Sequence, residues 1–172
     1  MKNLLVVIDV QNDFIDGALG FEGASDIVPH IIEKIKEYEA RGDDIIFTLD
    51  THGSCYMSSI EGSFLPIEHC IKGTHGHEIY KELKPYTEKY PVIEKPSFGS
   101  FEFGEMIKDK NYKNIELCGL VSNICVISNA VIAKAASMES NIIVDKKATS
   151  SNDLEMQEMA FKVMKNLHIN VV

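Results

Sequence analysis

Short runs of apolar residues, rich in Ile, Leu and Val, recur along the chain and are bounded by polar or turn-forming residues. Runs of about four to eight such residues are typical of strands that are buried on both faces of a parallel sheet. Six segments have this pattern: residues 3–9, 44–50, 91–95, 114–120, 141–146 and 168–172. We expect them to form one buried sheet.

The segments between these runs have the periodicity of amphipathic helices. Within residues 25–40, one stripe is apolar and consists of Ile27, Ile31, Ile35 and Tyr38, while charged residues occupy the opposite face. Similar patterns predict three more helices, at about 101–110, 123–138 and 153–167. Strands that alternate with helices indicate the α/β class, with a parallel sheet covered on both faces. The 172 residues and 45% hydrophobic content are enough for a single domain that spans the whole sequence.

One long segment, at about 51–90, interrupts this alternation. It contains four glycines, two prolines and four of the six histidines. Long irregular insertions in compact domains are usually functional. We therefore expect the chemistry of the protein to involve this segment.

The composition of the chain argues against nucleic acids and membranes as partners. The net charge is -9, with 17 basic and 26 acidic residues, and the basic residues are scattered, so no nucleic-acid partner is expected. No apolar run is long enough to span a membrane, and the first one is too short for a signal peptide, so we expect no membrane partner and a cytoplasmic location. The four cysteines have no CxxC spacing, and we predict no structural disulfide.

Reactive side chains follow the predicted strands. Asp9, Asp50 and Lys95 close the first three strands, and Cys125 begins the helix after the fourth. The carboxyl ends of parallel strands open on one edge of a sheet, so an acid, an amine and a thiol can meet there. Each residue also has a plain structural alternative: a turn cap for Asp9, a solvated strand end for Lys95 and a core thiol for Cys125. Their joint occurrence at neighbouring strand ends favours the catalytic interpretation.

The tripeptide DTH places Asp50 and His52 two residues apart on one face of an extended chain, which suits a divalent metal. Glu61 and His69, further along the same segment, are the candidates to complete such a site. The alternative is that the histidines of this segment are surface residues. We assign two of them to that class: His75 and His77.

Five motifs together resemble the isochorismatase-like cysteine hydrolases and, within them, the nicotinamidase-type amidases. They occur in order along most of the chain: VIDVQNDF, DTH, HCIKGTHG, EKPSFGSF and GLVSNICV. The resemblance implies a Rossmann-like three-layer α/β/α sandwich with a mainly parallel sheet, and a catalytic triad of Asp9, Lys95 and Cys125. It also implies a cis peptide bond between Leu120 and Val121, with the backbone amides of Val121 and Cys125 forming an oxyanion hole.

The resemblance further implies a divalent metal ion, for which we expect zinc, with manganese and iron as alternatives. Asp50, His52 and His69 match the family's ligand pattern. The segment 57–59 occupies the place where some members have a further histidine, so we expect Glu61 as the fourth ligand.

The substrate pocket is less well specified. Phe14 matches the family's aromatic residue after QND, and we expect the pocket to include Phe14, Phe64, Phe98 and Asn123. Two features depart from the pattern of many nicotinamidases, which have Asp at the position of Asn123 and a tryptophan in the metal loop. This chain has no tryptophan.

The expected function is that of a metal-dependent cysteine amidohydrolase that converts a small carboxamide, with nicotinamide the best candidate, to the acid and ammonia through a Cys125 thioester. The alternatives are another small amide, a carbamoyl or ureido compound, or a vinyl ether of the isochorismate type. A non-catalytic binding protein of the same fold is a third possibility, but no triad residue is missing. Because relatives of this kind are often dimers or tetramers, we expect a homo-oligomer.

Overall fold

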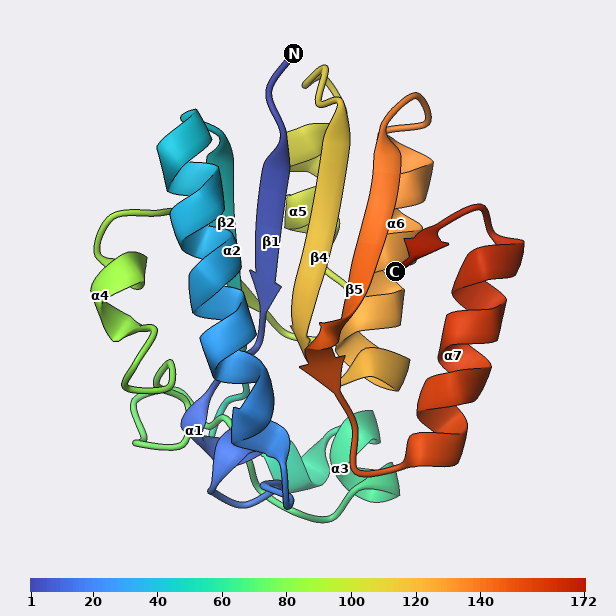
Figure 1. Cartoon of the computed structure of the whole chain (residues 1–172). Coiled ribbons are helices and arrows are strands. Elements are labelled where there is room, and N and C mark those ends of the chain that lie inside the picture. Colours follow the sequence, from blue (N-terminus) through green and yellow to red (C-terminus); the bar gives the residue numbers. More distant parts are fainter.

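A six-stranded sheet forms the middle layer of the molecule (Figure 1). The computed structural model describes residues 1–172. Every neighbouring pair of strands is parallel, and their order is β3-β2-β1-β4-β5-β6. The strands are β1 Leu4–Ile8, β2 Asp44–Asp50, β3 Val92–Lys95, β4 Asn114–Leu120, β5 Asn141–Ser150 and β6 Asn170–Val171. This order is that of a doubly wound α/β sheet, which confirms the expected fold class.

Helices cover both faces of the sheet (Figure 1). The helices are α1 Asn12–Ile15, α2 Val28–Arg41, α3 Ile60–Phe64, α4 Lys84–Thr87, α5 Phe101–Ile107, α6 Ile127–Ala136 and α7 Leu154–Asn166. One apolar core lies between the sheet and α2, and the other lies between the sheet and α5, α6 and α7. The three-layer sandwich is thereby confirmed. None of these helices has the length and apolar character needed to cross a membrane.

The alternation of side chains along β1 shows how one strand serves both cores. Leu5 and Val7 pack into the core beneath α2. Leu4, Val6 and Ile8 point the other way, into the core beneath α5, α6 and α7. All five are at most 1% exposed, which explains why the sequence of this strand is apolar without interruption.

Two predicted helices begin later than their apolar periodicity indicated. A 3-10 turn at Ala24–Ile27 precedes α2, and Pro29 lies in the first turn of α2, where its missing N–H is not needed. The predicted helix 123–138 is likewise split into a π-helical turn, Ser122–Val126, followed by α6. Single π-helical turns of this kind often occur at functional sites.

The segment between β2 and β3 has little regular structure. It contains a 3-10 turn at Tyr56–Ser58 and the short helices α3 and α4. In Figure 1 it lies below the carboxyl ends of the strands and continues along the side of the sheet as α4. It is therefore placed to cover the sheet edge at which reactive groups were expected.

Candidate active site and metal centre

The carboxyl ends of four adjacent strands carry the polar side chains of the site. Asp9 follows β1 directly, Asp50 and Lys95 end β2 and β3, and Cys125 lies in the π-helical turn after β4. These strands are neighbours in the order β3-β2-β1-β4, so residues far apart in sequence converge. The connections change direction between β1 and β4, and this switch point is where open α/β sheets bind ligands.

The amine of Lys95 lies between a carboxylate and a thiol. Its Nζ is 2.6 Å from Asp9 Oδ2 and donates a hydrogen bond of 3.4 Å to Cys125 Sγ. It also donates to the backbone carbonyl of Ser97 at 3.0 Å. Asp9, Lys95 and Cys125 are 0%, 1% and 5% exposed. Lys95 is thus within reach of both Asp9 and Cys125, and a neighbouring base and a positive charge are the groups that activate a nucleophile.

Burial dominates the protonation of this group. It raises the pKa of the Cys125 thiol well above its ordinary value, and the carboxylate of Asp9 acts in the same direction, while Lys95 opposes both. Burial also raises the pKa of Asp9, against the effect of the Lys95 ammonium. For Lys95, burial would lower the pKa, but the charges of Asp9, Cys125 and Asp50 outweigh it and keep the amine protonated. The resting thiol therefore holds its proton next to a carboxylate whose pKa is raised, which suits a general base.

The backbone and a neighbouring hydroxyl hold the carboxylate of Asp9 in place. Asp9 adopts a left-handed conformation with φ of 49°, which non-glycine residues adopt infrequently and often at functional sites. The Thr48 hydroxyl donates a hydrogen bond of 2.7 Å to Asp9 Oδ1. This leaves Oδ2 for Lys95.

The peptide bond between Leu120 and Val121 is cis, as the resemblance implied. Cys125 follows within the next helical turn, and the backbone carbonyl of Val121 accepts hydrogen bonds from the amides of Ile124 and Val126. The oxyanion role of the amides of Val121 and Cys125 stays a prediction.

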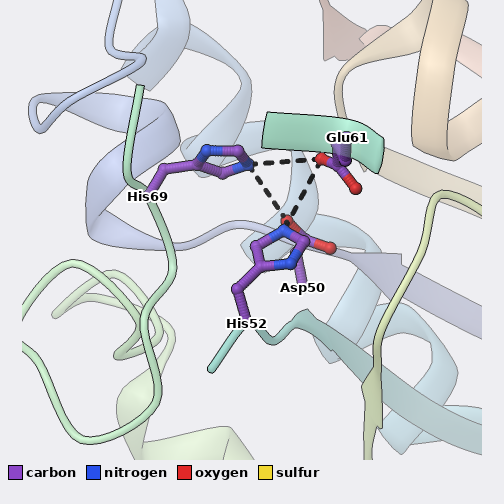
Figure 2. A group of neighbouring side chains, drawn as sticks. All are labelled: Asp50, His52, Glu61 and His69. Atoms are coloured by element: carbon purple, nitrogen blue, oxygen red, sulfur yellow. Dashed lines mark hydrogen bonds and ion pairs between the residues drawn. The ribbon is translucent and has the colours of Figure 1, made fainter. Parts of the chain in front are cut away.

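Four side chains from β2 and the following segment converge beside this group (Figure 2). Their ligand atoms all lie within 4.8 Å of one another: those of Asp50, His52, Glu61 and His69. His52 Nε2 is 2.9 Å from Asp50 Oδ2 and 3.6 Å from Glu61 Oε1. His69 Nε2 is 3.5 Å from Asp50 Oδ2 and 3.7 Å from Glu61 Oε1. The four residues expected as ligands are therefore brought together.

This geometry fits a divalent ion. Ligand distances of about 2.0–2.2 Å would separate tetrahedral ligands by about 3.3–3.6 Å, close to the separations in this cluster. The ring Nδ1 of His69 lies 2.8 Å from the carbonyl of Ile67. When Nδ1–H donates to that carbonyl, Nε2 presents its lone pair to the ion, which is the usual arrangement of a ligating histidine. Two nitrogens and two carboxylate oxygens suit zinc, manganese or iron.

The expected pocket residues do not all share one cavity. A cavity of about 650 Å³ is lined by His52 and Glu61 of the cluster together with Phe64, Ser97 and Phe98. Phe64 is 87% exposed and Phe98 42%, so both lie at its mouth. The cavity is large enough for a small aromatic amide.

The other two expected pocket residues lie elsewhere. Phe14 lines a second cavity with Val121 and Ile124, and its ring lies edge-on to His69 with 5.8 Å between centroids. Asn123 lines neither cavity, and its buried Oδ1 has no hydrogen-bond partner. The substrate contacts of these residues stay a prediction.

Sequence comparison assigns the chain to a known family. The isochorismatase domain model matches residues 3–172. The chain belongs to the isochorismatase family. A relative from Bacillus subtilis (strain 168), an uncharacterized isochorismatase family protein named PncA, is 29% identical over 167 residues, which cover 90% of each chain.

Solved structures of the family have the same fold. The nicotinamidase PncA from Bacillus subtilis superposes with a TM-score of 0.86 at 29% identity, over 100% of this chain and 99% of that one. The pyrazinamidase of Pyrococcus horikoshii in complex with zinc superposes with a TM-score of 0.87 at 26% identity, again over 100% and 99% of the two chains.

One prediction about this family member was wrong. His77 is not a surface histidine: it is 8% exposed, and its Nε2 lies 2.8 Å from the Thr51 hydroxyl. The reason is that residues 76–80 pair with residues 10–13 through backbone hydrogen bonds, which folds the segment inward. His75, by contrast, is exposed as expected.

Sequence reasoning also missed the residues that anchor the metal segment. Gln11, fully buried, donates to the carbonyls of Asp50 and His77, both at 2.9 Å, and accepts from the Asp50 amide at 2.8 Å. Asp13 accepts the Cys70 amide at 2.7 Å, next to His69. The signal was present in the QND motif, but spacing alone does not show what these side chains bind.

Proposed function

We propose that the protein is a metal-dependent cysteine amidohydrolase that hydrolyses a small carboxamide, with nicotinamide converted to nicotinate and ammonia as the leading reaction. The observation that carries the proposal is the placement of Lys95 Nζ at 2.6 Å from Asp9 and 3.4 Å from Cys125. The likeness to a nicotinamidase and to a pyrazinamidase supports a carboxamide substrate.

In the proposed first half-reaction, Asp9 takes the proton of the Cys125 thiol while the sulfur attacks the carboxamide carbon. The carbonyl oxygen becomes an oxyanion, which the amides of Val121 and Cys125 stabilise. One such donor is typically worth about 10²- to 10³-fold in rate. The C–N bond then breaks, and Asp9 transfers its proton to the departing ammonia, leaving a thioester on Cys125.

In the second half-reaction, a water molecule attacks the thioester and Asp9 accepts its proton. The C–S bond breaks, the acid is released, and the thiolate recovers its proton from Asp9. Lys95 stays protonated throughout and orients both Asp9 and Cys125 from its position between them. Its further bond to the Ser97 carbonyl fixes that orientation.

Asp50, His52, Glu61 and His69 would hold the divalent ion, with zinc the first choice. When bound, the ion would supply a Lewis acid for a polar group of the substrate. Phe64 and Phe98 line the cavity beside this cluster and are the proposed apolar walls for the substrate. We also propose that the protein is a homo-oligomer and that it is cytoplasmic.

The test is ammonia release from a panel of nicotinamide, pyrazinamide, other small carboxamides and ureido acids. Each is assayed with purified protein, after chelation, after metal add-back, and with Cys125→Ala. Release from nicotinamide that disappears with the chelator and in the variant supports the proposal. Release from ureido acids alone, or no release with metal bound, refutes nicotinamide as the substrate.

A further inference from the structure

A buried amide side chain connects the thiol segment to the loop after β3. Asn129, in the first turn of α6, is fully buried. Its Nδ2 donates hydrogen bonds to the carbonyls of Cys125 at 2.8 Å and Phe98 at 3.0 Å, and its Oδ1 accepts the amide of Ser100 at 3.0 Å. The orientation of the amide follows from these partners, because both neighbours of Nδ2 are acceptors and the neighbour of Oδ1 is a donor.

The loop that Asn129 holds carries two parts of the site. The Ser97 carbonyl accepts a hydrogen bond from Lys95 at 3.0 Å, and Ser97 and Phe98 line the cavity beside the metal cluster. Asn129 therefore binds the backbone of Cys125 and also the backbone of the loop whose Ser97 carbonyl accepts a hydrogen bond from Lys95.

The loop that contains Gly99 packs closely against α6, which brings its backbone within reach of Asn129. A Cβ at Gly99 would come within 2.6 Å of Ile132 Cδ1, so the loop lies directly against α6. Because no side chain at Gly99 separates the loop from the helix, the amide of Asn129 reaches two backbone groups of the loop at once. Among the hydrogen bonds of residues 96–100, the only other side chain that binds the backbone of the loop is that of Lys95, through the Ser97 carbonyl.

We propose that Asn129 is a positioning residue that holds residues 96–100, and through them Lys95, in register with Cys125. The inference rests on the proposed function, in which Cys125 is the nucleophile. Asn129 itself touches no reacting atom. Without it, the loop is free to move, the Ser97 carbonyl no longer restrains Lys95, and the ammonium is less well held at 3.4 Å from Sγ.

Two substitutions separate the contacts. Asn129→Leu keeps the branching at Cγ and the number of side-chain heavy atoms, and it removes all three hydrogen bonds. Asn129→Ser is milder, because a serine hydroxyl can still donate to the carbonyl four residues earlier, that of Cys125, but cannot reach the loop. The matched control is Ser140→Ala: Ser140 is 4% exposed and donates to the Tyr112 carbonyl at 2.7 Å, beyond the far end of α6.

The first measurement needs no substrate. Alkylation of Cys125 by iodoacetamide is followed by peptide mass spectrometry across a pH series in the folded wild type and the three variants. We expect both Asn129 variants to shift the Cys125 profile to higher pH, since the thiol loses part of the stabilisation that its anion receives from Lys95. Hydrogen exchange at the Ser100 amide should rise in the same two variants. Ser140→Ala should change neither.

The second measurement is steady-state hydrolysis of the substrate that the wild type accepts. Misplacement of a reacting group by about 1 Å can cost up to about 10²-fold in rate, so we expect kcat to fall about 10- to 100-fold in Asn129→Leu. Identical Cys125 alkylation profiles in the wild type and both Asn129 variants overturn the inference, because a purely structural role would lower only thermal stability. A wild type without amidase activity but with shifted Asn129 profiles refutes the proposed function and leaves the positioning role standing.

Discussion

Replacing Asp9 with asparagine isolates the charge of the buried ion pair. Asn has nearly the shape of Asp, and its Oδ1 can still accept the hydrogen bond that the Thr48 hydroxyl donates at 2.7 Å. What disappears is the negative charge 2.6 Å from Lys95 Nζ. Both side chains have no exposed surface, so water cannot take the place of the lost carboxylate.

The expected cost follows from these contacts. Removing one partner of a buried pair typically destabilises a protein by about 3–5 kcal/mol, because the other charge is left uncompensated. Here Asp50 Oδ1 remains 3.4 Å from Lys95 Nζ, so we expect the lower end, about 3 kcal/mol. Adding Lys95→Met removes the orphaned charge, and the double variant should recover most of the loss in unfolding free energy.

Urea denaturation of the wild type, both single variants and the double variant measures these differences, provided that the m-value stays constant. The matched control is Lys2→Met, which breaks an exposed pair with Asp44 and should change stability by no more than about 1 kcal/mol. Loss of the general base should reduce ammonia release by about 10²- to 10⁴-fold in Asp9→Asn, and Lys95→Met should not restore it. An Asp9→Asn variant as stable as the wild type, or a double variant less stable than Asp9→Asn, would refute the reasoning.

Three further outcomes test other parts of the structure. At free zinc 100 times its Kd, the wild type should gain about 2.7 kcal/mol of stability, whereas His69→Ala should gain far less at the same concentration; equal gains in calorimetry would place the ion elsewhere. Asp13→Ala removes the acceptor of the Cys70 amide and should weaken zinc binding by about 10- to 100-fold, measured by competition with a chelating dye; unchanged affinity would deny Asp13 a role in ordering the metal segment. Burial would raise the pKa of Asp43, but hydrogen bonds led by that from Arg41 lower it from 3.8 to about 2. A carboxyl with a lowered pKa in the folded state stabilises the protein at a pH above its unfolded-state pKa. The stability advantage of the wild type over Asp43→Asn should therefore be constant above about pH 5 and shrink as the pH falls toward 2; a difference independent of pH in urea titrations contradicts this.

The sequence predicted the fold and most of the candidate site because both depend on order along the chain. Apolar runs separated by amphipathic segments indicate a parallel sheet. In such a sheet the carboxyl ends of all strands lie at the same edge, so the residues that follow the strands are expected there. This reasoning places Asp9, Asp50, Lys95 and Cys125 close together from the sequence alone. Glu61 and His69 were expected from their place in the segment after DTH, and in the structure His69 Nε2 lies 3.7 Å from Glu61 Oε1.

Contacts between segments that are distant in sequence depend on the folded chain, and the sequence pattern did not predict them. The burial of His77, the anchoring of the metal segment by Gln11 and the bridge made by Asn129 all depend on side chains that bind backbone groups elsewhere in the chain. Such bonds leave no periodicity, because the partner is a carbonyl or an amide that every residue possesses. The residues at the strand ends can therefore be predicted from the local sequence pattern, because each directly follows an apolar run. The side chains that orient these residues depend on how the loops pack in the folded protein.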